Sequence, residues 1–126
     1  MSSTGALEKA LEIAAHIEEL GPIAVRRYFG GAALVAGKTQ FAILMSGRLY
    51  LRADGETRAS LRALGGKPFT YQGKGRIIEV RAYYEAPSIV VNDPNRLAEY
   101  AMQAYRNAAA LRRSRKRANV GTGYRL

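Results

Sequence analysis

The stretch that decides the fold is residues 41–52, Phe-Ala-Ile-Leu-Met-Ser-Gly-Arg-Leu-Tyr-Leu-Arg. It contains two runs of β-prone residues, 41–45 and 48–52, separated only by Ser46 and Gly47. A two-residue gap with glycine in its second position is typical of the tight turn that joins two antiparallel strands. The sequence therefore predicts a β-hairpin here, around which the other elements are arranged.

The two faces of this hairpin differ in chemistry. The turn sets a register in which Leu44 lies opposite Leu49 and Ala42 lies opposite Leu51, so one face is wholly aliphatic. Because side chains alternate along a strand, the second face is predicted to carry Phe41, Ile43, Met45, Arg48, Tyr50 and Arg52. That face is either the rim of a core, where arginine heads reach water, or a surface that binds a partner.

Length and composition favour one globular domain. The chain has 126 residues, 48% of them hydrophobic, which is enough for a single core. It has no apolar run of membrane-spanning length and its first residues lack the order of a signal peptide, so we expect a soluble, cytoplasmic protein. The formal net charge of +10 favours an anionic partner.

Periodicity outside the hairpin predicts the remaining elements. Further strands are expected at residues 23–29, 32–36, 69–71 and 76–85, with a break or bulge at Gly30-Gly31. Helices are expected up to about Leu20, from Gly55 to Leu64 and from Pro94 to about Leu111. The predicted fold class is α+β, an antiparallel sheet of about five or six strands, built as a meander and hairpins, packed with an amino-terminal helix, a short middle helix and a carboxy-terminal helix.

The end of the chain is unusually basic. Beyond Leu111 there are six positive charges and no acid, carried by Arg112, Arg113, Arg115, Lys116, Arg117 and Arg125. Residues 1–111 hold 14 bases and 10 acids, a net +4, so the tail supplies +6 of the total +10. We predict one domain over residues 1–111 and, over 112–126, a basic tail that is either largely disordered or a fraying extension of the last helix.

Residues suited to catalysis are scarce. The chain has no cysteine and a single histidine, His16, so neither a Cys-His pair nor a thiolate metal site can form. His16 has no partner of the kind that a serine nucleophile requires, and Glu18-Glu19 fits a solvated helix face. We predict no catalytic residue, no metal site and no cofactor, and therefore a protein that is not an enzyme.

Several short motifs follow one another in a defined order over about residues 20–106. They are Gly21-Pro22, Arg27-Tyr28-Phe29-Gly30-Gly31, residues 47–52, Lys67-Pro68-Phe69-Thr70-Tyr71, Tyr83-Tyr84-Glu85-Ala86-Pro87 and Asp93-Pro94. Their order and spacing resemble the amino-terminal domain of the TfoX/Sxy competence-regulator family. The resemblance implies a bacterial α+β domain without known catalytic residues, linked to the regulation of DNA-uptake genes together with the cyclic-AMP receptor protein or other transcription partners.

Two departures from the family pattern stand out. Tyr28 occupies a position where family members usually have methionine. The full-length regulators also carry a second, helical carboxy-terminal domain, for which this sequence has only the basic tail. We therefore expect a stand-alone copy of the amino-terminal domain, in which the fold carries over better than the role.

Two classes of function stay open. The first is a nucleic-acid-associated regulator, because residues 23–83 carry eleven Lys and Arg against three Asp and Glu, and alternation places Arg81 and Tyr83 where they could share a face with Arg48, Tyr50 and Arg52. The second is a protein interaction module that binds through the same sheet or an exposed strand edge.

The candidate contact residues are the same for both classes. They are Arg26, Arg27, Arg48, Arg52, Lys74, Arg76, Arg81, Arg112, Arg113, Arg115, Lys116 and Arg117. The candidate partners are nucleic acid, contacted non-specifically or together with a transcription factor, and a regulatory protein. We expect no membrane binding, and a homodimer is a further alternative.

Overall fold

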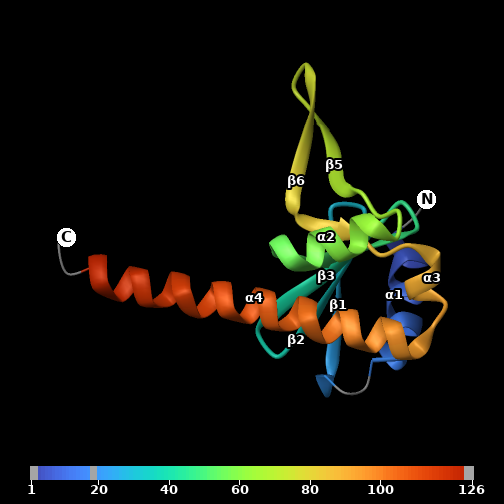
Figure 1. Cartoon of the computed structure of the whole chain (residues 1–126), viewed down its shortest axis with the longest axis horizontal. Helices are drawn as coiled ribbons and strands as arrows, with labels where there is room; N and C mark the ends of the chain where they lie inside the picture. The colour runs from blue at the N-terminus through green and yellow to red at the C-terminus, as the bar shows by residue number, and fades with distance from the viewer. Residues whose placement is uncertain (1–2, 18–19, 124–126) are drawn as a thin grey trace.

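The computed structural model of the chain describes residues 3–17 and 20–123, without the side chains of residues 3–4, 112 and 114–123. The elements in chain order are α1 (Ser3–Ala15), β1 (Ile23–Tyr28), β2 (Gly31–Ala36), β3 (Thr39–Met45), β4 (Arg48–Arg52), α2 (Gly55–Ala63), β5 (Pro68–Gly73), β6 (Arg76–Glu85), α3 (Ser88–Val91) and α4 (Pro94–Gly123). Figure 1 shows the helices gathered around the sheet, with the hairpin of β5 and β6 projecting from it.

The six strands form one antiparallel sheet in the order β1-β2-β3-β4-β6-β5. The first four strands make a meander, after which β6 pairs with β4 and leaves β5 at the edge. The central hairpin has the predicted register, since Leu44 pairs with Leu49 and Ala42 with Leu51. Ser46 and Gly47 both have positive φ, as a two-residue hairpin turn requires. The predicted α+β fold class is confirmed.

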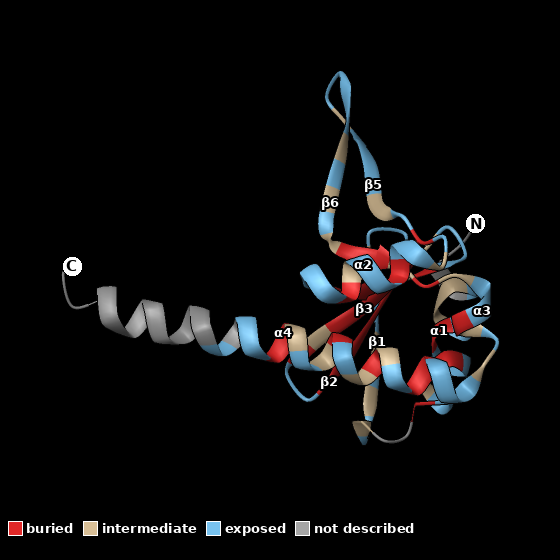
Figure 2. Ribbon diagram, in the orientation of Figure 1, coloured by how far each residue is buried: buried red, intermediate tan, exposed pale blue. Residues whose placement is uncertain are grey.

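The main core lies between the sheet and the helices α1 and α4. The aliphatic face of the central hairpin is buried there, with Leu44, Leu49 and Leu51 almost fully covered. Alanines of α4, among them Ala101 and Ala104, pack against it with little bulk and keep the helix close to the sheet. In Figure 2 the buried red segments include β3, behind α4, and turns of α1 and α4, whereas the outer part of the β5–β6 hairpin is exposed.

One core residue lies on the opposite face from the one predicted. Phe41 was expected beside Ile43 on the second face, but it is fully buried in the main core with Ala42. The cause is a register shift in the β2–β3 pair, where Leu34 pairs with Ala42 and Val35 pairs with Gln40. Phe41 is the extra residue in β3 at this bulge, and a bulge interrupts the simple alternation of side chains.

Two predicted boundaries are wrong by more than a turn. Helix α1 ends at Ala15 instead of about Leu20, although Ile17 beyond it is still buried in the main core. Helix α4 continues to Gly123 instead of ending near Leu111, and it projects past the sheet. Neither Gly nor Pro occurs between Pro94 and Gly121, and the sequence there is rich in Ala and Arg, which favour helix. The backbone of the basic tail thus follows the helical alternative as far as Gly123.

Candidate nucleic-acid interface

The sheet face turned away from α1 and α4 carries a second cluster of apolar and aromatic residues, which we call the aromatic face. Its members are Tyr28, Ala33, Ile43, Met45, Tyr50, Phe69, Val80, Ala82 and Tyr83. All of them come from strands, and each of the six strands contributes at least one, in the sheet order β1, β2, β3, β4, β6 and β5. Ala33, Ile43 and Tyr83 are buried among the larger rings. The aromatic face is therefore a packed surface made by strands alone.

The rings of this face contact one another in series. Tyr50 meets Phe69 edge to face, with 5.1 Å between ring centroids, and Phe69 stacks on Tyr71 at 6.2 Å. Tyr71 is about half exposed on the edge strand. Burial raises the pKa of Tyr50, and the nearby Glu85 carboxylate raises it further. Tyr50 is consequently a neutral phenol at physiological pH.

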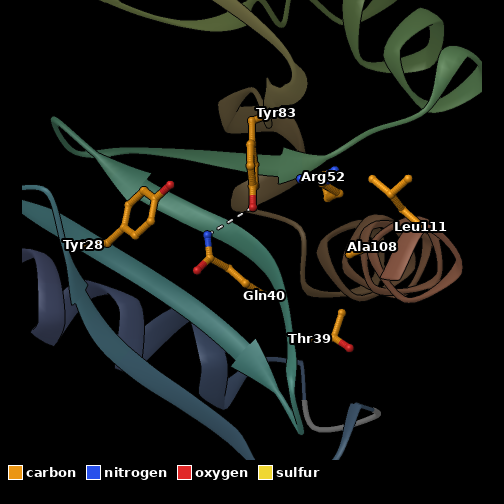
Figure 3. Close-up of a pocket in the computed structure, with 7 residues that line it drawn as sticks. All are labelled: Tyr28, Thr39, Gln40, Arg52, Tyr83, Ala108 and Leu111. Carbon is orange, nitrogen blue, oxygen red and sulfur yellow. Dashed lines mark hydrogen bonds between the residues drawn. The ribbon is translucent and has the colours of Figure 1, made fainter. Parts of the chain in front are cut away.

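A pocket of about 360 Å³ opens where this face meets α4. It is lined by Tyr28, Thr39, Gln40, Arg52, Tyr83, Ala108 and Leu111 (Figure 3). The Gln40 side-chain amide donates a hydrogen bond to the Tyr83 hydroxyl at 3.1 Å. The Arg52 guanidinium lies over the Tyr83 ring, 5.3 Å from its centroid. The pocket thus combines aromatic walls with a cation and an amide, a set of groups that suits a planar polar ligand.

The turn between β1 and β2 adds an exposed ring that contacts the pocket residue Tyr28. The strand predicted over residues 23–29 ends at Tyr28, and Phe29 and Gly30 form a two-residue turn with φ values of 45° and 83°. Phe29 is 84% exposed and meets Tyr28 edge to face at 4.8 Å. The predicted interruption at Gly30-Gly31 does not include Gly31, which is the first residue of β2. A Cβ atom at Gly31 would collide with the Leu44 carbonyl oxygen and the Met45 sulfur.

Three of the predicted contact arginines belong to the aromatic side of the sheet. Arg26 is exposed on β1 opposite Ala33, and Arg52 lies over Tyr83. Arg48 is opposite Met45, and its guanidinium lies 3.5 Å from the Glu85 carboxylate. Arg48 thus forms an ion pair with Glu85. No ion pair is described for Arg26 or Arg52, the other two predicted cations on this side.

The other predicted contact residues of the sheet lie elsewhere. Arg27 is opposite Ala32, a residue of the main core, and therefore points to the helix side of the sheet. Lys74 and Arg76 are exposed at the end of the projecting hairpin. These three residues do not share a surface with Arg52.

Arg81 is also separated from the face on which alternation placed it. The register of β5 and β6 jumps from Pro68 opposite Tyr84 to Phe69 opposite Val80. Val80 and Ala82 consequently join the aromatic face, and Arg81 between them points away from it. Its guanidinium pairs with the Glu79 carboxylate at 3.1 Å. The prediction that Arg81 lies beside Tyr50 and Tyr83 is therefore wrong.

The basic tail begins at the pocket. Ala108 and Leu111 of α4 form one of the pocket walls, and Arg112 follows directly on the same helix. Arg113 is exposed. Among the predicted tail residues, the side chains of Arg112, Arg115, Lys116 and Arg117 lie outside what the structure describes. Sheet and tail, which were separate groups in the sequence, thus meet at one corner of the molecule.

Neither Gln40, which lines the pocket, nor the exposed ring of Phe29, which contacts the pocket residue Tyr28, was singled out from the sequence. Gln40 is bonded to Tyr83, forty-three positions later in the chain, and a contact at that separation leaves no local pattern. Phe29 did carry a signal, since Phe29-Gly30 between two apolar runs has the spacing of a hairpin turn, as Ser46-Gly47 has.

Within residues 3–17 and 20–123, no three His, Cys, Asp or Glu side chains are grouped so that they could hold a metal ion. In the same part of the chain, no helix combines the length and the apolar character needed to cross a membrane.

Comparison with known proteins agrees with the motifs and the fold. Residues 15–108, more than half of the chain, match the TfoX N-terminal domain. The chain is also 29% identical over 100 residues to the DNA transformation protein TfoX1 of Aliivibrio fischeri (strain ATCC 700601 / ES114), an alignment that covers 79% of this chain and 47% of the relative. The chain thus spans about half the length of that relative. The family is linked to competence, and this chain belongs to the TfoX N-terminal domain family.

Proposed function

We propose that this chain is a non-enzymatic regulatory domain that acts in competence or transcription regulation and contacts DNA through its basic residues. The observation that carries the proposal is the corner where Ala108 and Leu111 line the same pocket as Arg52, one residue before the basic run of α4. Two cationic segments, one on the sheet and one on a helix, are thereby available to one polyanion. The name of the relative, a DNA transformation protein, supports DNA as that polyanion.

The net charge of +10 fits this role because phosphate contacts dominate the affinity of proteins for nucleic acid. Such contacts fix position without reading sequence. The domain accordingly needs no recognition helix of its own, and a partner transcription factor would supply the base readout.

The test is a salt titration of DNA binding by the full chain and by a variant with a neutralised tail. In the variant, the five cations Arg112, Arg113, Arg115, Lys116 and Arg117 are replaced by glutamine, which preserves helix propensity. On duplex DNA the slope of log K against log salt should become shallower by about 0.9 for each phosphate contact that is lost. A matched control replaces Lys9, Arg58, Arg62, Lys67 and Arg96, none of them a candidate contact residue, by glutamine and so removes the same charge elsewhere. If both variants keep the wild-type slope, the basic residues of the tail do not contact DNA.

A protein adaptor is the second candidate, and the projecting hairpin favours it. Strand β5 is an edge of the sheet, and the hairpin exposes Tyr71 and Ile77, the latter by 68%. An exposed edge strand can accept a strand from another protein. If the chain does not bind DNA even at low salt, the adaptor role is favoured over the DNA-binding role.

A further inference from the structure

Phe29 has a conformation and an exposure that packing does not explain. A bulky side chain with positive φ is an outlier, and its ring is 84% exposed at the end of a hairpin. Asparagine or glycine would suit the turn better. Strained residues of this kind concentrate at binding and catalytic sites, which points to a function for the exposed ring.

The ring of Phe29 begins a series of aromatic groups that spans the sheet. It contacts Tyr28, which lines the pocket together with Tyr83. On the same face, towards the β5 edge of the sheet, Tyr50 contacts Phe69 and Phe69 contacts the half-exposed Tyr71. Strands β1 and β5 are the two edges of the sheet, and five strand spacings give a width of about 24 Å. That width offers room for several stacked bases.

The charges on the aromatic side suit a polyanion. Arg26 lies two residues before Tyr28 on β1, and Arg52 lies over Tyr83. The negative charge of Glu85, on the same side, is offset by Arg48, whose guanidinium lies 3.5 Å from the Glu85 carboxylate. Cations interleaved with rings are the combination with which proteins bind single strands, because phosphates need the cations and the faces of unpaired bases need the rings.

The pocket is suited to one base in particular. Its volume of about 360 Å³ lies between rings, and the Gln40 amide and the Tyr83 hydroxyl are polar groups that can bond to a base edge (Figure 3). A base in a duplex has its faces covered by its neighbours and its edge paired, so it cannot enter such a pocket. The ligand that uses both the rings and the pocket is therefore single-stranded.

We propose that the aromatic face binds single-stranded DNA, with bases stacked on Phe29 and Tyr71 and one base in the pocket of Tyr28, Gln40 and Tyr83. This inference rests on the proposed function, because it takes DNA as the polyanion. It adds the form of the DNA and the surface that holds it.

The test compares a labelled twelve-nucleotide oligo(dT), within the range of site sizes known for single-strand binders, with a duplex and an oligo(U) of equal length. The full chain should prefer oligo(dT). The chain has eight tyrosines and no tryptophan, so stacking should also quench its tyrosine fluorescence.

The variant Phe29→Asn removes a ring without changing charge. We expect it to bind oligo(dT) about tenfold more weakly, since stacking on one aromatic side chain is typically worth about 1–3 kcal/mol. Its salt slope and its affinity for the duplex should stay at the wild-type values. The control Ile89→Asn alters a half-exposed apolar residue of α3, away from the aromatic face, and should bind as the wild type does.

The results that would overturn the inference differ from those that would overturn the proposed function. Wild-type affinity of Phe29→Asn for oligo(dT), or tighter binding of the duplex, refutes the single-strand site while DNA binding stands. Equal or tighter binding of oligo(U) refutes the assignment to DNA. If the full chain binds none of the three at low salt, both proposals fail.

Discussion

The turn at Phe29 allows the cost of an exposed ring to be measured. Positive φ destabilises an L-residue by about 1–2 kcal/mol, and asparagine is the residue least destabilised after glycine. The ring recovers part of this through its edge-to-face contact with Tyr28, a kind of contact worth about 0.5–1.5 kcal/mol. Phe29→Ala loses the contact and keeps most of the strain. Phe29→Asn loses the same contact but relieves the strain, so we expect it to be more stable than Phe29→Ala by about 1 kcal/mol.

Urea unfolding followed by circular dichroism measures this difference. With a slope of about 2 kcal/mol per molar urea, the two midpoints should lie about 0.5 M apart. The turn at Ser46 and Gly47 provides the control, since Ser46 also has positive φ but has no aromatic ring whose contact could be lost. Ser46→Asn should therefore raise the midpoint relative to the wild type. Identical midpoints for the two Phe29 variants would refute the argument, because residue 29 would then not carry the strain assigned to it.

Three further predictions concern the packing and the helix caps. Leu49 is 3% exposed in the main core, so Leu49→Ala should cost about 2–5 kcal/mol in unfolding free energy; an unchanged thermal midpoint would contradict its placement. The Asp93 carboxylate accepts a hydrogen bond from the Asn95 backbone at 3.1 Å, so calorimetry should show Asp93→Ala to be less stable by about 1 kcal/mol. The hydrogen bond from the Thr57 backbone amide lowers the pKa of Asp54 below its unfolded value, so its stabilisation is present above the unfolded pKa and is lost as pH falls through the folded pKa. Asp54→Asn should flatten that acid-side loss, and an unaltered acid profile would argue against the cap.

Local patterns were sufficient for the centre of the fold. The Ser46-Gly47 turn fixed the pairing of Leu44 with Leu49, and alternation then identified the buried face correctly. The starts of α2 and α4 were likewise readable, because the capping carboxylates of Asp54 and Asp93 bond to amides only two or three residues away. These features depend on neighbours in the chain, which is the information that a single sequence contains.

Alternation failed wherever a bulge changed the register. Phe41 moved into the main core because of the shift between β2 and β3, and Arg81 moved off the aromatic face because of the shift between β5 and β6. A bulge depends on how two strands far apart in sequence fit against each other, so its position has no strong local signature. The pocket has the same origin, since Gln40 and Tyr83 meet only because β6 lies between β5 and β4 in the sheet and pairs with β4.

The helical form of the tail has a consequence for how the two cationic segments work together. At 1.5 Å per residue, residues 112–123 extend about 18 Å beyond the pocket wall. Only the first turn of this extension is close to Arg52, so the tail and the aromatic face would contact different parts of a bound strand. Contacts of the tail to phosphates weaken with salt, whereas stacking on the rings does not. Because most of the tail extends beyond the pocket wall, the losses from Phe29→Asn and from the neutralised tail should add when the variants are combined.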